Sequence, residues 1–137
     1  MAIATRDAKV GQPLPCVRKI IKLENMRLFS GWPVRTMHTD WEIAKKSGLP
    51  APIAQGLMSQ AFINEMCTAY FGKSWFETGR LDVRFVSFTV PGDRITVGGV
   101  VKEIESEGEA VRLVCDIWCE NDTGAKTLVG TASALID

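Results

Sequence analysis

The fold of this chain depends on one apolar stretch, residues 53–71, which reads IAQGLMSQAFINEMCTAYF. The stretch contains no proline and no interior run of β-branched residues, and its apolar side chains recur at helical spacing. They are Ala54, Leu57, Met58, Ala61, Phe62, Met66, Ala69 and Tyr70, with Ile63, Cys67 and Phe71 widening the stripe. A helix that is apolar around most of its circumference is buried. The stretch therefore predicts one long central helix, with Gly72 as its end.

Downstream of this helix the period of the pattern changes to two. From Leu81 to Ile136 apolar and polar residues alternate, which predicts four strands in an antiparallel meander. Turn-forming residues separate these strands at positions 91–93, 105–109 and 121–124. Gly98 and Gly99 interrupt the second of the four strands and predict a bulge or a close backbone approach.

Upstream of the helix, residues 17–23 predict a first strand, and an irregular stretch follows as far as Met37. The sequence that begins at Thr39 reads as a capping box, with Thr39 as N-cap and Glu42 as its reciprocal partner. It predicts a short helix that ends near Lys46. Together the elements predict an α+β fold in which an antiparallel sheet is wrapped around one long central helix, the arrangement called a hotdog fold. A single curved sheet leaves edges uncovered, so we expect a homodimer or a higher homo-oligomer.

Composition narrows the class of protein. The chain has 137 residues with 16 basic and 16 acidic side chains, so we expect one domain spanning 1–137 and no nucleic-acid partner. No apolar run approaches the roughly 20 residues that cross a bilayer, and the first residues lack the apolar core of a secretory signal. We therefore expect a cytoplasmic protein without a membrane partner.

The four cysteines favour a reduced protein without a metal. Cys115 and Cys119 lie four apart in a predicted strand, about 13 Å from each other, which is beyond the span of a disulfide. No Cys-x-x-Cys pair occurs, and His38 is the only histidine. We expect mostly buried, free cysteines, and neither a metal nor a resident cofactor.

Three segments of the chain carry a resemblance to a known family. The first has Ser30 and Gly31 followed by the His-Thr-Asp element of residues 38–40, and the second reads PIAQGLM at residues 52–58. The third, RFVSFTVPGD at residues 84–93, leads into a Pro-Gly-Asp turn. In this order and spacing they resemble the MaoC-like branch of the hotdog superfamily, which includes R-specific 2-enoyl-CoA hydratases.

The chain departs from that family where the chemistry is expected. The resemblance implies an active-site aspartate five residues before the histidine and an asparagine three before it, whereas this chain has Pro33 and Arg35 there. No carboxylate occurs between Glu24 and His38. The family's Asp/His pair is therefore half missing, and Glu65 on the central helix is a reserve candidate for the missing carboxylate.

The resemblance nevertheless implies roles for several residues. His38 is the catalytic candidate, because histidine exchanges protons near neutral pH. The backbone N–H of Gly56, at the start of the central helix, is expected to stabilise the oxyanion of the thioester. Asp40 is either a helix cap or a catalytic residue that orients His38 or a water.

Two further residues are candidates for substrate binding. Gln55 either simply opens the central helix or contacts the substrate. Arg35 is either a solvated residue or a substrate-binding one, since a guanidinium pairs with a carboxylate through two parallel hydrogen bonds. The second interpretation predicts an acyl group that carries an extra carboxylate.

The resemblance thus implies an acyl-CoA hydratase/dehydratase that acts on a 2-enoyl-CoA or 3-hydroxyacyl-CoA thioester. Two alternatives stay open at this point. One is a non-catalytic subunit that binds acyl thioesters, and the other is a hotdog thioesterase.

Overall fold

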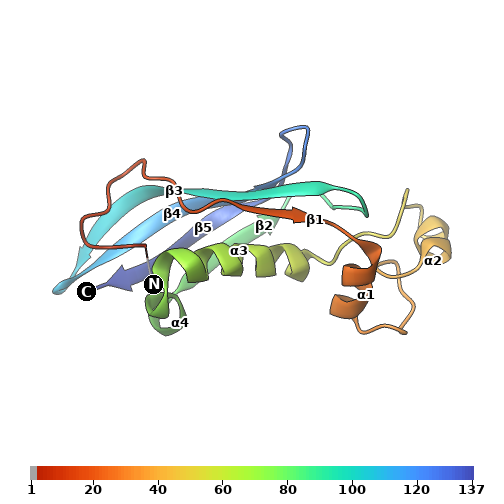
Figure 1. Ribbon diagram of the computed structural model, residues 1–137, viewed down its shortest axis with the longest axis horizontal. Coiled ribbons are helices and arrows are strands. Elements are labelled where there is room, and N and C mark those ends of the chain that lie inside the picture. The colour runs from red at the N-terminus through yellow and green to blue at the C-terminus, as the bar shows by residue number, and fades with distance from the viewer. Residues whose placement is uncertain (1–2) are drawn as a thin grey trace.

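The computed structural model describes residues 3–137 and shows a curved sheet with one long helix packed beneath it (Figure 1). In chain order the elements are β1 (Val17–Ile20), α1 (Leu23–Ser30), α2 (Trp41–Lys46), α3 (Gly56–Phe71), α4 (Lys73–Thr78), β2 (Arg80–Phe85), β3 (Arg94–Glu107), β4 (Ala110–Glu120) and β5 (Lys126–Ile136). The five strands lie in the order β1-β3-β4-β5-β2, and all neighbouring pairs are antiparallel. The predicted hotdog fold of the α+β class is confirmed.

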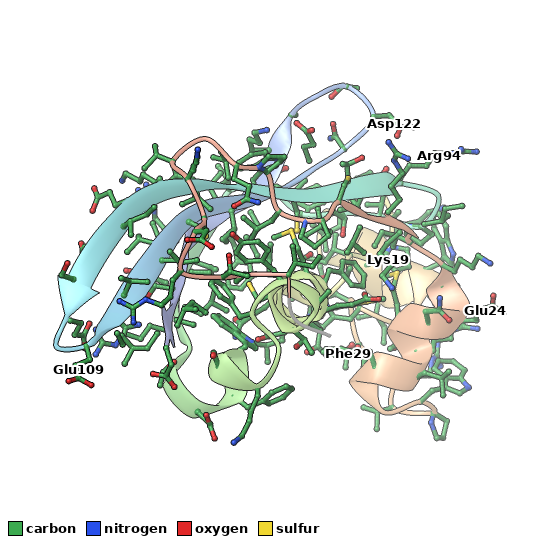
Figure 2. The ribbon with its side chains drawn as sticks, turned by 60° about the vertical axis from the view of Figure 1, so that its left-hand side comes forward. Lys19, Glu24, Phe29, Arg94, Glu109 and Asp122 are labelled. Carbon is green, nitrogen blue, oxygen red and sulfur yellow. The ribbon has the colours of Figure 1, made fainter. Side chains whose placement is uncertain are left out.

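The core lies between the inner face of the sheet and α3. Strand β4 alternates as its sequence predicts, with Leu113, Cys115, Ile117 and Cys119 buried toward the helix. From α3 the chain contributes Met58, Ile63, Met66, Cys67, Tyr70 and Phe71 to the same core. In Figure 2 the two hairpin tips, marked by Glu109 and Asp122, lie at opposite ends of the sheet. The sheet covers one side of the helix, whereas Leu57, Ala61, Glu65 and Ala69 on the other side are exposed. The prediction of a helix buried around most of its circumference is therefore correct only for the side that faces the sheet. The N-terminal end of α3 is the end near α1 (Figure 1).

The meander prediction is correct for β3, β4 and β5 and wrong for β2. Strand β2 pairs with β5, with Arg80 opposite Ser133, and it forms the edge of the sheet opposite β1. The residues after Phe85 then carry the chain back to β3, on the other side of β4 and β5. Alternation fixes which side chains face the core, but it is silent about which strands are neighbours.

Two helices and one cap differ from the sequence prediction. Helix α1 occupies part of the stretch expected to be irregular, and α4 follows α3 directly after Gly72. Neither α1 nor α4 has a side-chain N-cap, so the sequence lacks the usual start signal. The N-cap of α2 is Asp40, whose carboxylate accepts a hydrogen bond from the Ile43 amide, and the prediction of Thr39 as N-cap is wrong.

Thr39 has a different local role. Its hydroxyl donates to the carbonyl of Val34 and accepts from the amide of Thr36, at 2.9 Å each. Thr39 therefore holds two parts of the loop before α2 together, and it lies one residue before the N-cap Asp40.

The two glycines of β3 show a close approach rather than a bulge. A Cβ on Gly99 would lie 2.9 Å from the backbone oxygen of Asp116, and a Cβ on Gly98 would lie 2.9 Å from the indole nitrogen of Trp118. The register of β3 against β4 shifts further along, between Val101 and Glu103. All four cysteines are free, with Cys16 exposed and the other three buried, as the sequence predicts.

Candidate active site

A cavity of about 570 Å³ opens between the start of α3 and the loop that follows β2. Its lining includes His38, Gly56, Ser59, Phe85, Thr89 and Thr127. The cavity therefore brings together His38 and Gly56, two of the residues proposed from the sequence. A second hollow, of about 670 Å³, runs along α1 beside Arg27 and Trp32 and contains no histidine. The first cavity is consequently the better candidate for proton-transfer chemistry.

The orientation of the His38 ring follows from one hydrogen bond. Nδ1 lies 2.9 Å from the backbone carbonyl oxygen of Ile53. A carbonyl oxygen can only accept a hydrogen bond, so Nδ1 carries the proton. In the neutral ring this leaves Nε2 unprotonated and able to accept a proton. The backbone of His38 is itself held, because its amide donates to the Thr36 hydroxyl at 3.1 Å.

The residues just before α3 are extended because their backbone groups are bonded elsewhere. The Ile53 amide donates to the carbonyl of Met37, and the Ala54 amide donates to the carbonyl of Thr89. The helix consequently begins at Gly56 and not at Ile53. This short segment joins the histidine loop on one side to the loop after β2 on the other.

Gly56 combines a free donor with a tight contact. As the first residue of α3 it has no side-chain cap before it, and its N–H finds no hydrogen-bond acceptor among residues 3–137. Such N–H groups at a helix start carry partial positive charge and bind developing negative charge. The ring of Phe85 packs on the glycine so closely that a Cβ there would lie 2.9 Å from Cε1. A larger residue at position 56 would therefore push against the cavity wall.

Asp40 and Arg35 form a pair of their own outside this cavity. One carboxylate oxygen of Asp40 accepts from the Ile43 amide at 3.0 Å, and the other accepts from Arg35 Nε at 2.8 Å. The hydrogen bond from Arg35 lowers the pKa of Asp40, and the same bond raises the pKa of Arg35. Glu42 lies 3.6 Å from the guanidinium as a second acidic neighbour. These contacts support the helix-capping interpretation of Asp40. A catalytic role for Asp40 and substrate binding by Arg35 stay predictions.

Gln55 and Glu65 also have partners away from the cavity. The Gln55 amide donates to the Ser30 hydroxyl at 2.8 Å and so joins the end of α1 to the start of α3. Glu65 lies on the outer face of α3 and pairs with Lys19 at 2.7 Å. Among the described residues, no aspartate or glutamate lines the cavity that contains His38.

The structure adds hydroxyl residues that the sequence analysis missed, among them Ser59 and Thr89. Ser59 follows Gly56 by one helical turn, a spacing that places both on one face of α3. Thr89 lies in the loop between β2 and β3, within the third segment of the family resemblance. The spacing within α3 offered a signal for Ser59. Thr89 is held beside the start of α3 by the hydrogen bond from the Ala54 amide to its carbonyl, a contact between residues far apart in the chain.

Three of the four cysteine thiols lie in the core. Burial raises the pKa of Cys67, Cys115 and Cys119 to about 12, so these thiols stay protonated at neutral pH. No group of three or more histidine, cysteine, aspartate or glutamate residues within 3–137 is arranged to hold a metal ion. No helix in the same range has the length and hydropathy of a membrane-spanning segment.

Residues 12–115 match the family described as "MaoC like domain". No curated protein sequence matches significantly.

Several solved structures share the fold at low sequence identity. A MaoC-like dehydratase from Rhodospirillum rubrum is 18% identical with a TM-score of 0.80, over 95% of this chain and 93% of the other. The unliganded R-hydratase PhaJ1 from Pseudomonas aeruginosa is 22% identical with a TM-score of 0.80, over 99% and 88%. The ChsH1-ChsH2 complex from Mycobacterium tuberculosis contains a chain that is 16% identical, with a TM-score of 0.76, over 94% and 98%.

Proposed function

We propose that this chain, which belongs to the MaoC-like domain family, is an acyl-CoA hydratase/dehydratase. The reaction adds water across the double bond of a 2-enoyl-CoA, or removes it from a 3-hydroxyacyl-CoA. The observation that carries the proposal is the juxtaposition of His38, whose Nε2 is the free nitrogen, and the uncapped N–H of Gly56 in one cavity. The coenzyme A thioester is the substrate, and the proposal needs no resident cofactor.

The proposed chemistry requires one base and one oxyanion donor. Nε2 of His38 takes a proton from water as its oxygen bonds to C3 of the enoyl group. The electron pair of the double bond moves toward the thioester, and the Gly56 N–H stabilises the negative charge on the carbonyl oxygen. The protonated His38 then returns the proton to C2, which completes the addition of one water. Because no carboxylate lines the described cavity, His38 both accepts and returns the proton.

The same lack of a carboxylate also favours a second candidate, a non-catalytic subunit that binds acyl thioesters.

The test is to incubate the purified protein with a panel of 2-enoyl-CoAs. Loss of the conjugated-thioester absorbance without release of thiol is the expected result and supports hydration. Release of thiol would identify a thioesterase instead. Binding without either change would identify the non-catalytic subunit.

We also propose that a second copy of the chain covers the mouth of the cavity. Leu57, Phe85, Val86 and Phe88 line it and are all about half exposed or more. Strand β2 is an edge strand, with β5 as its one neighbour in the sheet. Apolar side chains beside an open strand edge are typical of a protein interface. Light scattering at micromolar concentration should give at least twice the mass of 15.1 kDa, and a stable monomer would contradict the proposal.

A further inference from the structure

The hydroxyl of Thr89 stands out in the described part of the molecule. The residue is only 3% exposed, and its Oγ1 is buried without any hydrogen-bond partner. No other side-chain nitrogen or oxygen of residues 3–137 is buried and unpaired in this way. A buried hydroxyl without a partner costs free energy that a valine of the same shape would avoid. Such a group requires an explanation.

Thr89 is held opposite His38 by a single peptide group. The carbonyl of Ile53 accepts from His38 Nδ1, and the amide of Ala54, in the same peptide unit, donates to the Thr89 carbonyl at 2.9 Å. The C=O and N–H of a trans peptide point in opposite directions, so His38 and Thr89 lie on its two sides. Both residues line the cavity, and the peptide unit comes two residues before Gly56. The backbone thereby fixes the spacing of the histidine, the threonine and the start of α3.

The proposed hydration requires a second hydrogen-bonding group besides His38. The oxygen that bonds to C3 must be held in place while His38 exchanges its proton, and a base alone leaves that oxygen free to turn. A threonine hydroxyl both donates and accepts hydrogen bonds. Rotation about χ1 moves a threonine hydroxyl from one staggered position to another, so the hydroxyl of a residue that lines the cavity can turn toward a ligand.

We propose that Thr89 is a positioning residue that hydrogen-bonds the oxygen at C3 of the acyl group, either the incoming water or the 3-hydroxyl. This inference rests on the proposed hydratase function. In this arrangement Thr89 partly replaces the carboxylate that the histidine lacks, as a hydrogen-bonding group and not as an acid or a base. It predicts that the cavity distinguishes a 3-hydroxyacyl-CoA from the acyl-CoA without that hydroxyl.

The test compares the affinities of 3-hydroxybutyryl-CoA and butyryl-CoA by calorimetry. For the wild type we expect the hydroxylated ligand to bind about 3- to 10-fold more tightly, the range of one neutral hydrogen bond. Thr89→Val should bring this ratio close to one, and Thr89→Ser should retain it. The matched control is Thr127→Val, because Thr127 lines the same cavity and is also 3% exposed, but its hydroxyl has the Cys119 carbonyl as a partner. That control should leave the ratio unchanged.

Kinetics provide a second readout. In a wild type that hydrates crotonyl-CoA, Thr89→Val should lower kcat more than it raises KM, and Thr89→Ser should restore kcat. Thermal melting should find Thr89→Val at least as stable as the wild type, and Thr89→Ala replaces it if the valine variant does not fold.

The outcomes separate the inference from the proposed function. A wild type that hydrates, combined with a Thr89→Val variant that keeps both the affinity ratio and kcat, overturns the inference alone. A wild type that discriminates through Thr89 but does not hydrate overturns the proposed function alone. A wild type that binds neither ligand overturns both.

Discussion

The sheet with α3 and the segment from α1 to the start of α3 are held by different interactions. On the inner face of β4 the side chains of Leu113 and Ile117 are almost fully buried, and backbone ladders join the strands on both sides. The segment of residues 23–55 depends instead on side chains that bond to backbone groups. Arg27 donates to the carbonyl of Thr39 at 3.0 Å and stacks over the ring of Trp32, 4.0 Å from its centroid.

The two regions therefore have different roles: the sheet with α3 stabilises the fold, and the segment of residues 23–55 supplies groups for the proposed chemistry. The sheet and α3 supply most of the buried apolar residues of the core, and they give the cavity apolar wall residues and the N–H of Gly56. The segment of residues 23–55 exposes several large apolar side chains, yet it supplies His38 and the peptide group that orients it. Substitutions in the sheet should therefore change the free energy of unfolding, and substitutions in the segment should change turnover or local structure.

The largest effect is expected at His38. His38→Gln removes the proton acceptor, so we expect the rate of enoyl-CoA hydration to fall by about 10² to 10⁴. The melting temperature should stay close to that of the wild type, because the ring is only partly buried. Steady-state kinetics and thermal melting on the same preparation check this. Unchanged turnover in a folded variant would remove the catalytic assignment.

A core substitution in the sheet should instead lower the stability of the fold. Leu113→Ala leaves a cavity between β4 and α3, and we expect the free energy of unfolding to fall by about 2–5 kcal/mol. Urea unfolding measures this change. The control is Leu28→Ala in α1, where the side chain is 80% exposed and the effect should stay within about 0.5 kcal/mol. Equal losses for the two variants would contradict the separation.

A smaller effect is expected at the cap of α2. Asp40→Ala removes both the cap and the partner of Arg35, and we expect the melting temperature to fall by about 2–5 °C at neutral pH. The pKa of Asp40 is lowered in the folded protein, so its contribution is present above the ordinary value of 3.8 and is lost as the pH falls through the folded value.

The difference between wild type and Asp40→Ala should accordingly shrink in acid, which melting curves at several pH values measure. Asp40→Asn is the matched control, because asparagine also caps helices but cannot form the ion pair. A difference that is independent of pH would show that the ion pair contributes nothing.

The smallest effect is expected at Arg35. Its guanidinium is paired with Asp40 and does not line the cavity, so we expect Arg35→Ala to change the ratio of activities on monocarboxylic and dicarboxylic acyl-CoAs by less than about twofold. The alternative prediction from the sequence is a preference for dicarboxylic substrates that disappears in the variant. Measuring both substrates on both proteins decides between them.

Local patterns in the sequence were sufficient for the elements with strong periodicity. The apolar stripe of residues 53–71 predicted α3, and the alternation after Gly79 predicted which residues of β2 to β5 are strands. His38 and Gly56 were found through their motifs, and the cavity contains both. These features are local because a helix or a strand imposes its own period on neighbouring residues.

The order of the strands and the composition of the cavity depended on contacts between distant residues. The pairing of β2 with β5, and the approach of Thr89 to the peptide between Ile53 and Ala54, join parts of the chain more than thirty residues apart. The carboxylate of Asp40 and the guanidinium of Arg35 could have pointed toward substrate, but they bond to each other at 2.8 Å. Sequence alone determined the helix, the strands and the two principal candidates for the site. Only the tertiary structure decided which polar groups share a cavity, because a side chain's partners are set by the packing of whole elements and not by its neighbours in the chain.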